Sequence, residues 1–168
     1  MIRFAAAIVL AGVLAFAADT RKTAGVQVPL GLLPLEWPKD NPYSADKVAL
    51  GRLLYFDKRL SQDDTVACAS CHSPEHGYTD GAPNSEGIHG QHGNRSAPTV
   101  LNRAYSLAQF WDGRAPTLEE QAKGPIANPI EMGNTHVDVV AKINAIQAYR
   151  VLFQSDFRAH VAQRQLAL

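Results

Sequence analysis

Two cysteines with a histidine directly after the second constrain this chain more than any other stretch. The run is Cys68-Ala69-Ser70-Cys71-His72. Covalent haem attachment needs this arrangement, because the two sulfurs bond the porphyrin edge and the imidazole reaches the iron. The motif therefore predicts one covalently held haem c, bound through Cys68 and Cys71, with His72 as the proximal iron ligand.

A Cys-x-x-Cys pair also occurs in zinc sites and in dithiol redox centres. A structural zinc ion takes four ligands, and the chain contains 2 cysteines, so histidines would have to complete the tetrahedron. A thioredoxin-like pair is expected between a strand and a helix, and no such βαβ pattern is visible. Haem is thus the favoured interpretation, and zinc and a dithiol pair are the alternatives.

Residues 1–17 have the organisation of a secretory signal peptide. Arg3 supplies the positive start, residues 4–16 form an apolar run, and Ala15-Phe16-Ala17 offers small residues for cleavage. The run is short for a membrane span, so we expect cleavage and no stable membrane insertion, with an uncleaved anchor as the alternative. Because c-type haem is attached outside the bacterial cytoplasm, the leader and the haem motif both predict a periplasmic protein.

The charge and cysteine counts narrow the classes of partner. Lysine plus arginine and aspartate plus glutamate number 16 each in a chain of 168 residues. This balance gives no reason to expect nucleic acid or an anionic membrane as a partner. Both cysteines belong to the haem motif, which leaves none for a structural disulfide. We therefore expect the haem to fill part of the core and the chain to fold poorly without it.

The sequence pattern outside the leader and the haem motif predicts an all-α, c-type cytochrome-like haem domain with long loops, over residues 44–168. Prolines and glycines make residues 18–43 an extended N-terminal arm, and residues 73–97 a long glycine-rich loop suited to covering a haem face. Capping residues and apolar spacing predict helices at residues 44–56, 98–104, 117–124, 135–146 and 148–160. No alternating strand is evident.

The second axial position of the iron separates an electron carrier from a site that binds peroxide. The candidate ligands are Met132, His76, His89, His92, His136 and His160. Met132 suits a single-haem electron-transfer cytochrome c with no catalysis. The neighbouring Glu131 instead favours a site that binds peroxide. A carboxylate is costly to bury beside a thioether ligand, but it can serve as an acid-base group for O–O cleavage. An ordinary exposed glutamate is the alternative for Glu131.

Two further groups stand out without being specific in isolation. His89 and His92 lie in the glycine-rich loop, where either can cap the iron at rest and swing away, or can simply face solvent. Phe110-Trp111-Asp112-Gly113-Arg114 joins two aromatics to an ion pair. Trp111 can fill the core or, beside a haem, relay electrons. Arginines nearby can pair with haem propionates.

Taken together, residues 50–157 resemble the N-terminal haem domain of the bacterial di-haem cytochrome c peroxidases. Besides the haem motif, the matching runs are Leu50-Gly51-Arg52-Leu53-Leu54-Tyr55-Phe56-Asp57, Asp80-Gly81, Arg95-Ser96-Ala97-Pro98-Thr99, Gln109-Phe110-Trp111-Asp112-Gly113-Arg114 and Glu131-Met132-Gly133. The resemblance also extends to related di-haem enzymes that oxidise protein tryptophans.

The resemblance implies a reaction and a set of site residues. Hydrogen peroxide would be reduced to water with electrons from a small cytochrome c or a copper protein. His72 would be the proximal ligand and Glu131 the catalytic acid-base group, with Gln121 and Phe110 lining the pocket and Trp111 relaying electrons toward a second haem. Met132 would not bind the iron.

Three departures qualify what the resemblance implies. The displaceable histidine of many members aligns with Ile88, so His89 serves as the resting ligand only if the loop shifts by one residue. Ser96 stands where many members have an asparagine that helps bind calcium between the domains, which weakens the expectation of calcium. A second Cys-x-x-Cys-His motif is absent from the sequence. We therefore expect a truncated member with one haem, partnered by a second haem domain or by a copy of itself.

Overall fold

The computed structural model describes residues 22–23 and 26–155. The chain forms two compact units, residues 1–42 and residues 43–168. The predicted signal peptide and the end of the last predicted helix lie outside the described residues. In the described part, no helix is long and apolar enough to cross a membrane.

The first unit contains a short antiparallel ladder. Strand β1 (Lys22–Thr23) pairs with strand β2 (Val26–Gln27). The sequence pattern predicted no strand here, because two-residue strands are too short to show an alternation. Residues 28–42 contain no helix. Val28 is buried, whereas Leu30 and Leu33 are exposed.

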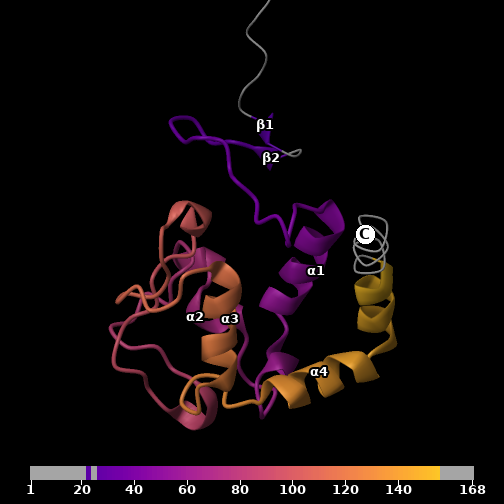
Figure 1. Cartoon of the computed structure of the whole chain (residues 1–168). Helices are drawn as coiled ribbons and strands as arrows, with labels where there is room; N and C mark the ends of the chain where they lie inside the picture. The colour runs from indigo at the N-terminus through magenta and orange to yellow at the C-terminus, as the bar shows by residue number, and fades with distance from the viewer. Residues whose placement is uncertain (1–21, 24–25, 156–168) are drawn as a thin grey trace, which may run out of the picture. The chain divides into compact units, whose positions relative to one another are not determined.

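The second unit is helical, with long connections between short elements (Figure 1). Its α-helices are α1 (Ala45–Tyr55), α2 (Cys68–Cys71), α3 (Leu118–Ala127) and α4 (His136–Ala145), and residues 147–155 are also helical. Its 3₁₀ helices are η1 (Lys58–Leu60), η2 (Pro74–His76), η3 (Ile88–Gly90) and η4 (Arg103–Tyr105). The predicted all-α fold is confirmed.

Three helices begin where their capping residues predicted. The hydroxyl of Ser44 accepts the Lys47 N–H, and Thr117 and Thr135 do the same at the first turns of α3 and α4. Each cap satisfies one of the backbone donors that a helix start leaves without a partner. These starts could be predicted because the signal is contained in four consecutive residues.

Two helix predictions are wrong. No helix begins at Pro98, because Asn102 takes a left-handed conformation (φ 57°) and a single 3₁₀ turn, η4, follows instead. The predicted stop at Gly124-Pro125 also fails, since α3 continues to Ala127. A proline disfavours helical backbone in the preceding residue partly through that residue's Cβ, and Gly124 has none.

The core of the second unit is small. Its buried apolar residues are Leu50, Leu60, Val66, Ile88, Met132, Ile143 and Tyr149. Helix α1 contributes Leu50, while Val48, Leu53 and Phe56 stay 55, 52 and 48% exposed. The apolar spacing of residues 44–56 predicted one buried face, but the core reaches this helix along a narrow line, at Leu50 and the partly buried Leu54.

Polar contacts join α4 to the segment that leads into Cys68. The ammonium of Lys142 donates to the carbonyl of Ser61 (2.8 Å) and pairs with Asp64 (2.6 Å). The Asn134 amide donates to the Leu60 carbonyl at 3.0 Å. These contacts satisfy backbone acceptors that no helix or sheet engages, and they position the approach to the haem motif.

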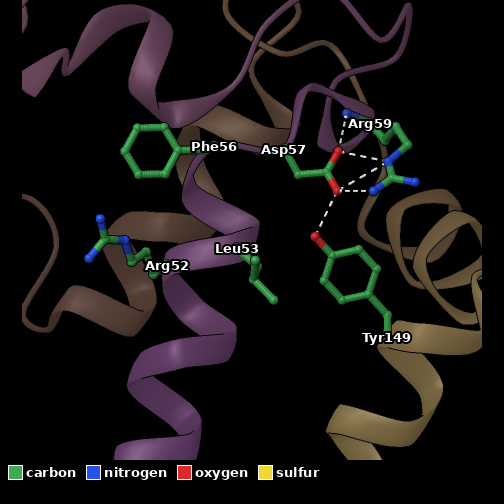
Figure 2. Close-up of a pocket in the computed structure, with 6 residues that line it drawn as sticks. All are labelled: Arg52, Leu53, Phe56, Asp57, Arg59 and Tyr149. Carbon is green, nitrogen blue, oxygen red and sulfur yellow. Dashed lines mark hydrogen bonds and ion pairs between the residues drawn. The ribbon is translucent and has the colours of Figure 1, made fainter.

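A second polar cluster joins the end of α1 to the last helix. In Figure 2, Arg59 and Tyr149 converge on the carboxylate of Asp57, at the edge of a pocket of about 420 Å³. The Arg59 Nε and the Tyr149 hydroxyl donate to it at 2.8 and 2.7 Å. The hydrogen bonds from Arg59, and then that from Tyr149, hold the pKa of Asp57 well below its usual range.

We expect Asp57→Asn to make the fold less stable at neutral pH but not in acid. The folded-state pKa of Asp57 is lowered, so its contribution is fully present above the ordinary pKa of about 4 and is lost as the pH falls below that value. The variant should lose about 1 to 3 kcal/mol of unfolding free energy at pH 7. Urea unfolding of the haem-loaded protein should show the two curves converging below pH 4. The exposed Asp40, changed to Asn, is the control, and a constant difference at every pH would contradict the assignment.

Candidate functional site

The two cysteines lie on a single helical turn. Helix α2 spans Cys68–Cys71, and its start is fixed by the Ser70 hydroxyl, which accepts the Ala67 N–H at 3.0 Å. Residues three apart lie on the same side of a helix, so both thiols face one way. Both cysteines are free and partly buried. One turn of helix thus presents two thiols on the same side.

Both thiols are in their protonated form at neutral pH. Burial raises the pKa of Cys68, and burial together with the Asp80 and Glu131 carboxylates raises that of Cys71 to about 11. A desolvated thiol is a poor metal ligand and is slow to oxidise. This environment therefore favours thiols that stay reduced until they form thioethers.

The tautomer of His72 is fixed by a backbone carbonyl. Its Nδ1 lies 3.3 Å from the carbonyl oxygen of Tyr78. A carbonyl can only accept, so Nδ1 carries the hydrogen and Nε2 keeps its lone pair. Histidines that bind metals are commonly held in this way, because the hydrogen bond at one nitrogen sets the orientation and basicity of the other. Nε2 of His72 is therefore the nitrogen that remains available to a metal.

A tight turn presents the Tyr78 carbonyl to the imidazole. Ser73 and Thr79 form an antiparallel bridge, and the Tyr78 N–H donates to the Ser73 carbonyl at 2.8 Å. Tyr78 itself has a φ of 63°, a conformation that non-glycine residues seldom adopt. The Thr99 hydroxyl anchors the turn by donating to the Gly77 carbonyl at 2.7 Å.

Tyr55 contacts the same site, and the sequence analysis did not assign it a role. Its hydroxyl donates to the His72 carbonyl at 2.6 Å, and its ring centroid lies 6.4 Å from that of Tyr78. Burial raises its pKa to about 12, so it stays a donor. The only sequence signal for Tyr55 was its place in the run from Leu50 to Asp57. That run does not show which residue the tyrosine contacts.

Glu131 lies in the same region as the haem motif. Its carboxylate contributes to the raised pKa of Cys71, and its Oε1 accepts the Asn128 side-chain amide at 2.7 Å. The Ile88 N–H donates to the Glu131 carbonyl at 2.9 Å. The glycine-rich loop and the Glu131 segment are therefore joined through their backbones, and the carboxylate is held by its own turn.

Phe110 packs against the side of α3 on which Gln121 lies. The Phe110 ring contacts the helix at Gly124, where an added Cβ would lie 3.0 Å from its Cζ atom. The Arg114 guanidinium covers the ring at 3.5 Å from the centroid. Gln121 precedes Gly124 by one helical turn, so it lies on the same side as the contact with Phe110. Both residues are half-buried.

Trp111 does not fill the core, so that alternative is wrong. It is 62% exposed, and its indole N–H donates to the Ser96 carbonyl at 3.0 Å. It lines a pocket of about 260 Å³ together with Thr79 and Asp80. Thr79 follows the residue whose carbonyl holds His72, so Trp111 stands near the His72 turn.

Two of the candidate distal ligands have other partners in the fold. His89 is 60% exposed at its side chain, and its Nδ1 lies 3.5 Å from an Asp63 carboxylate oxygen. Met132 is 3% exposed in the core cluster, with its carbonyl accepting the Gln62 N–H. Among the residues described, no group of three or more His, Cys, Asp or Glu side chains is arranged to hold a metal ion.

The residues present fit a covalent haem. Two reduced thiols share one side of a helical turn, the next residue offers a free Nε2, and a carboxylate held by an amide belongs to the same region. A zinc ion would need thiolates and two more ligands, neither of which this arrangement supplies. The fold and site are those of a c-type haem-binding domain.

Comparison with known proteins identifies the family. Residues 45–168, more than half of the chain, match the model of the di-haem cytochrome c peroxidases. The chain belongs to this family.

Individual relatives agree with the family match. The chain is 47% identical over 116 residues to the cytochrome c551 peroxidase of Nitrosomonas europaea, which covers 69% of this chain and 35% of that protein. It is 44% identical over 120 residues to the methylamine utilization protein MauG of Methylorubrum extorquens, covering 71% and 34%. The chain thus spans about a third of the length of these relatives.

A solved structure shows the same fold. A MauG-like protein associated with microbial copper homeostasis superposes with a TM-score of 0.72 at 37% identity, covering 78% of this chain and 39% of that chain.

We expect Gly87→Ala to disrupt the site, because Gly87 lies against the Glu131 segment. An added Cβ would lie 2.0 Å from the Ile130 carbonyl oxygen and 2.7 Å from that of Glu131. The variant should lose about 3 kcal/mol of unfolding free energy, the upper range of overpacking costs. Urea unfolding would measure it. Gly93→Ala in the same loop is the control, since its Cβ would meet nothing closer than 3.8 Å. Equal stability of the two variants would contradict this contact.

Proposed function

We propose that this chain is the peroxidatic haem domain of a periplasmic cytochrome c peroxidase. Hydrogen peroxide takes up two electrons and two protons and yields two waters, and a small cytochrome c or copper protein supplies the electrons. The observation that carries the proposal is the hydrogen bond from His72 Nδ1 to the Tyr78 carbonyl, which frees Nε2 beside two reduced thiols. Family membership supports the same reaction.

Cys68, Cys71 and His72 hold the cofactor in this proposal. The bound haem supplies a redox-active iron at which peroxide is reduced. One haem c would be attached by thioethers to Cys68 and Cys71, and Nε2 of His72 would bind the iron. The thiol environment and the fixed tautomer of His72 support these assignments.

Glu131 moves the proton that O–O cleavage requires. The Asn128 amide fixes Oε1 of the carboxylate, and we assign Oε2 as the atom that takes a proton from one peroxide oxygen and returns it to the other. Such a group typically contributes about 100- to 10,000-fold to a rate. Gln121 and Phe110, on one side of α3, line the pocket and orient the peroxide.

Trp111 would relay electrons from a donor toward the bound haem. Its exposure and its closeness to the His72 turn support this role, because a relay must meet a donor on one side and the haem environment on the other. The donor domain is a second haem domain or another copy of the chain. His89, which pairs with Asp63 here, would be the displaceable resting ligand if the loop shifted by one residue.

Four further assignments complete the proposal, namely the three segments of the chain and a calcium ion. Residues 1–17 are a signal peptide, residues 18–43 an arm and residues 44–168 the haem domain. Calcium is the weakest of them, because Ser96 offers a shorter side chain than the asparagine of many relatives and its carbonyl accepts the Trp111 indole. The pocket beside Asp80, whose buried Oδ2 has no hydrogen-bond partner among the described residues, is where a cation would be sought.

A stoichiometric assay tests the reaction. The haem-loaded protein is mixed with hydrogen peroxide and an excess of a reduced small cytochrome c, and oxidation is followed by absorbance. The proposal expects two cytochromes oxidised for each peroxide consumed. An unchanged cytochrome spectrum, over a background without the protein, would rule out the peroxidase activity of this chain.

A further inference from the structure

Tyr55 contacts both partners of the hydrogen bond that holds the proximal histidine. Its hydroxyl donates to the His72 carbonyl at 2.6 Å, a short O–H···O distance. Its ring packs at 6.4 Å and 60° against Tyr78, whose carbonyl accepts the Nδ1 hydrogen of His72. Seventeen residues separate Tyr55 from His72, so this contact depends on the tertiary fold.

The backbone at His72 needs such a contact. His72 ends helix α2 with φ −125° and ψ 63°, outside the helical region. Its carbonyl therefore points away from the helix axis, and the Tyr55 hydroxyl meets it there. The hydrogen bond from Nδ1 to Tyr78 is itself long, at 3.3 Å, so a small movement of either residue changes its strength.

Helix α1 holds Tyr55 rigidly. The neighbouring Phe56 packs edge-on against the Tyr55 ring, with centroids 5.1 Å apart and planes at 72°. On the same helix, Leu50 is buried in the core cluster and Leu54, directly before Tyr55, packs against it. Tyr55 thus transmits the position of α1 to the two residues of the proximal hydrogen bond.

We propose that Tyr55 is a positioning residue that sets the strength of the His72–Tyr78 hydrogen bond and, through it, the reduction potential of the haem iron. The inference rests on the proposed function in one respect, namely that His72 binds the iron. A stronger hydrogen bond at Nδ1 gives the imidazole more anionic character, which favours ferric over ferrous iron. Loss of the Tyr55 hydroxyl should loosen the bond and favour the ferrous form.

Tyr55→Phe removes the hydroxyl and keeps the ring. Redox titration of the haem-loaded variant should show the reduction potential shifted upward. At a fixed applied potential, the ratio of ferric to ferrous iron should fall about threefold. Loss of a direct hydrogen-bond partner of a ligand typically changes metal affinity or activity by about 10- to 100-fold, and we expect a smaller effect here because Tyr55 acts one contact further out. Resonance Raman of the ferrous form should show a lower iron–imidazole stretching frequency.

Tyr149→Phe is the matched control, since it removes a hydroxyl with a similar hydrogen bond that goes to Asp57 instead. Because the haem is covalent, the loaded fraction of a poorly incorporated variant can be purified and titrated. An unchanged potential and frequency in Tyr55→Phe, or an equal shift in Tyr149→Phe, would overturn the proposal. Both readouts report the ligand's surroundings whatever the rate with peroxide, so they are independent of whether the chain is a peroxidase.

Discussion

His72→Gly should keep the haem attached but lose the reaction with peroxide. The thioethers depend on Cys68 and Cys71, whereas the iron loses the Nε2 that the Tyr78 carbonyl leaves free. Removing a ligand should cost more than the 10- to 100-fold typical of losing its hydrogen-bond partner, so we expect a loss of about 100-fold or more. Stopped-flow absorbance of the purified variant mixed with peroxide measures this rate.

Imidazole in the buffer provides the discriminating control. It should enter the space that the side chain leaves, bind the iron and restore part of the rate. His136→Gly removes a histidine at the start of α4, remote in sequence from the motif, and should leave the haem spectrum unchanged. If the spectrum of His72→Gly matched that of the original protein and did not respond to imidazole, the proximal ligand would have to be another residue.

Glu131→Gln should retain haem and slow the peroxide reaction by at least about tenfold, and by as much as the 100- to 10,000-fold that a general acid-base group supplies. Glutamine keeps the shape and can still accept the Asn128 amide that fixes Oε1. It cannot carry a proton from one peroxide oxygen to the other. The rate constant for the first step after mixing with peroxide is the relevant measurement.

A second carboxylate separates this effect from a general change of charge. Glu120 is exposed on α3 and pairs with Lys123 at 2.6 Å, so Glu120→Gln removes a charge of the same kind without touching the site. Its rate should equal that of the original protein. Equal rates for both variants would remove Glu131 from the chemistry, whereas a loss of haem in Glu131→Gln would indicate a structural role.

The parts of the fold that the sequence predicted are encoded locally. Ser44, Thr117 and Thr135 start helices because each cap involves residues within four positions. The haem motif is equally local, since one turn of α2 presents both thiols. Such features can be identified without knowledge of what packs around them.

The parts that could not be predicted depend on contacts far apart in the chain. The apolar spacing of α1 suggested a buried face, but how much of it the core reaches depends on segments such as α4, and Leu53 stays half exposed. The stop expected at Gly124-Pro125 failed because Gly124 accommodates both the proline and the Phe110 ring. The fixed tautomer of His72 needs the unusual φ of Tyr78, which the sequence does not reveal.

Coordination of the iron in the ferrous, haem-loaded protein tests the central claim most directly. Absorbance and resonance Raman should show five-coordinate, high-spin iron with a single histidine ligand, and carbon monoxide should bind at once. A six-coordinate, low-spin ferrous spectrum that does not change on adding carbon monoxide would show a site closed on both sides and would contradict this account.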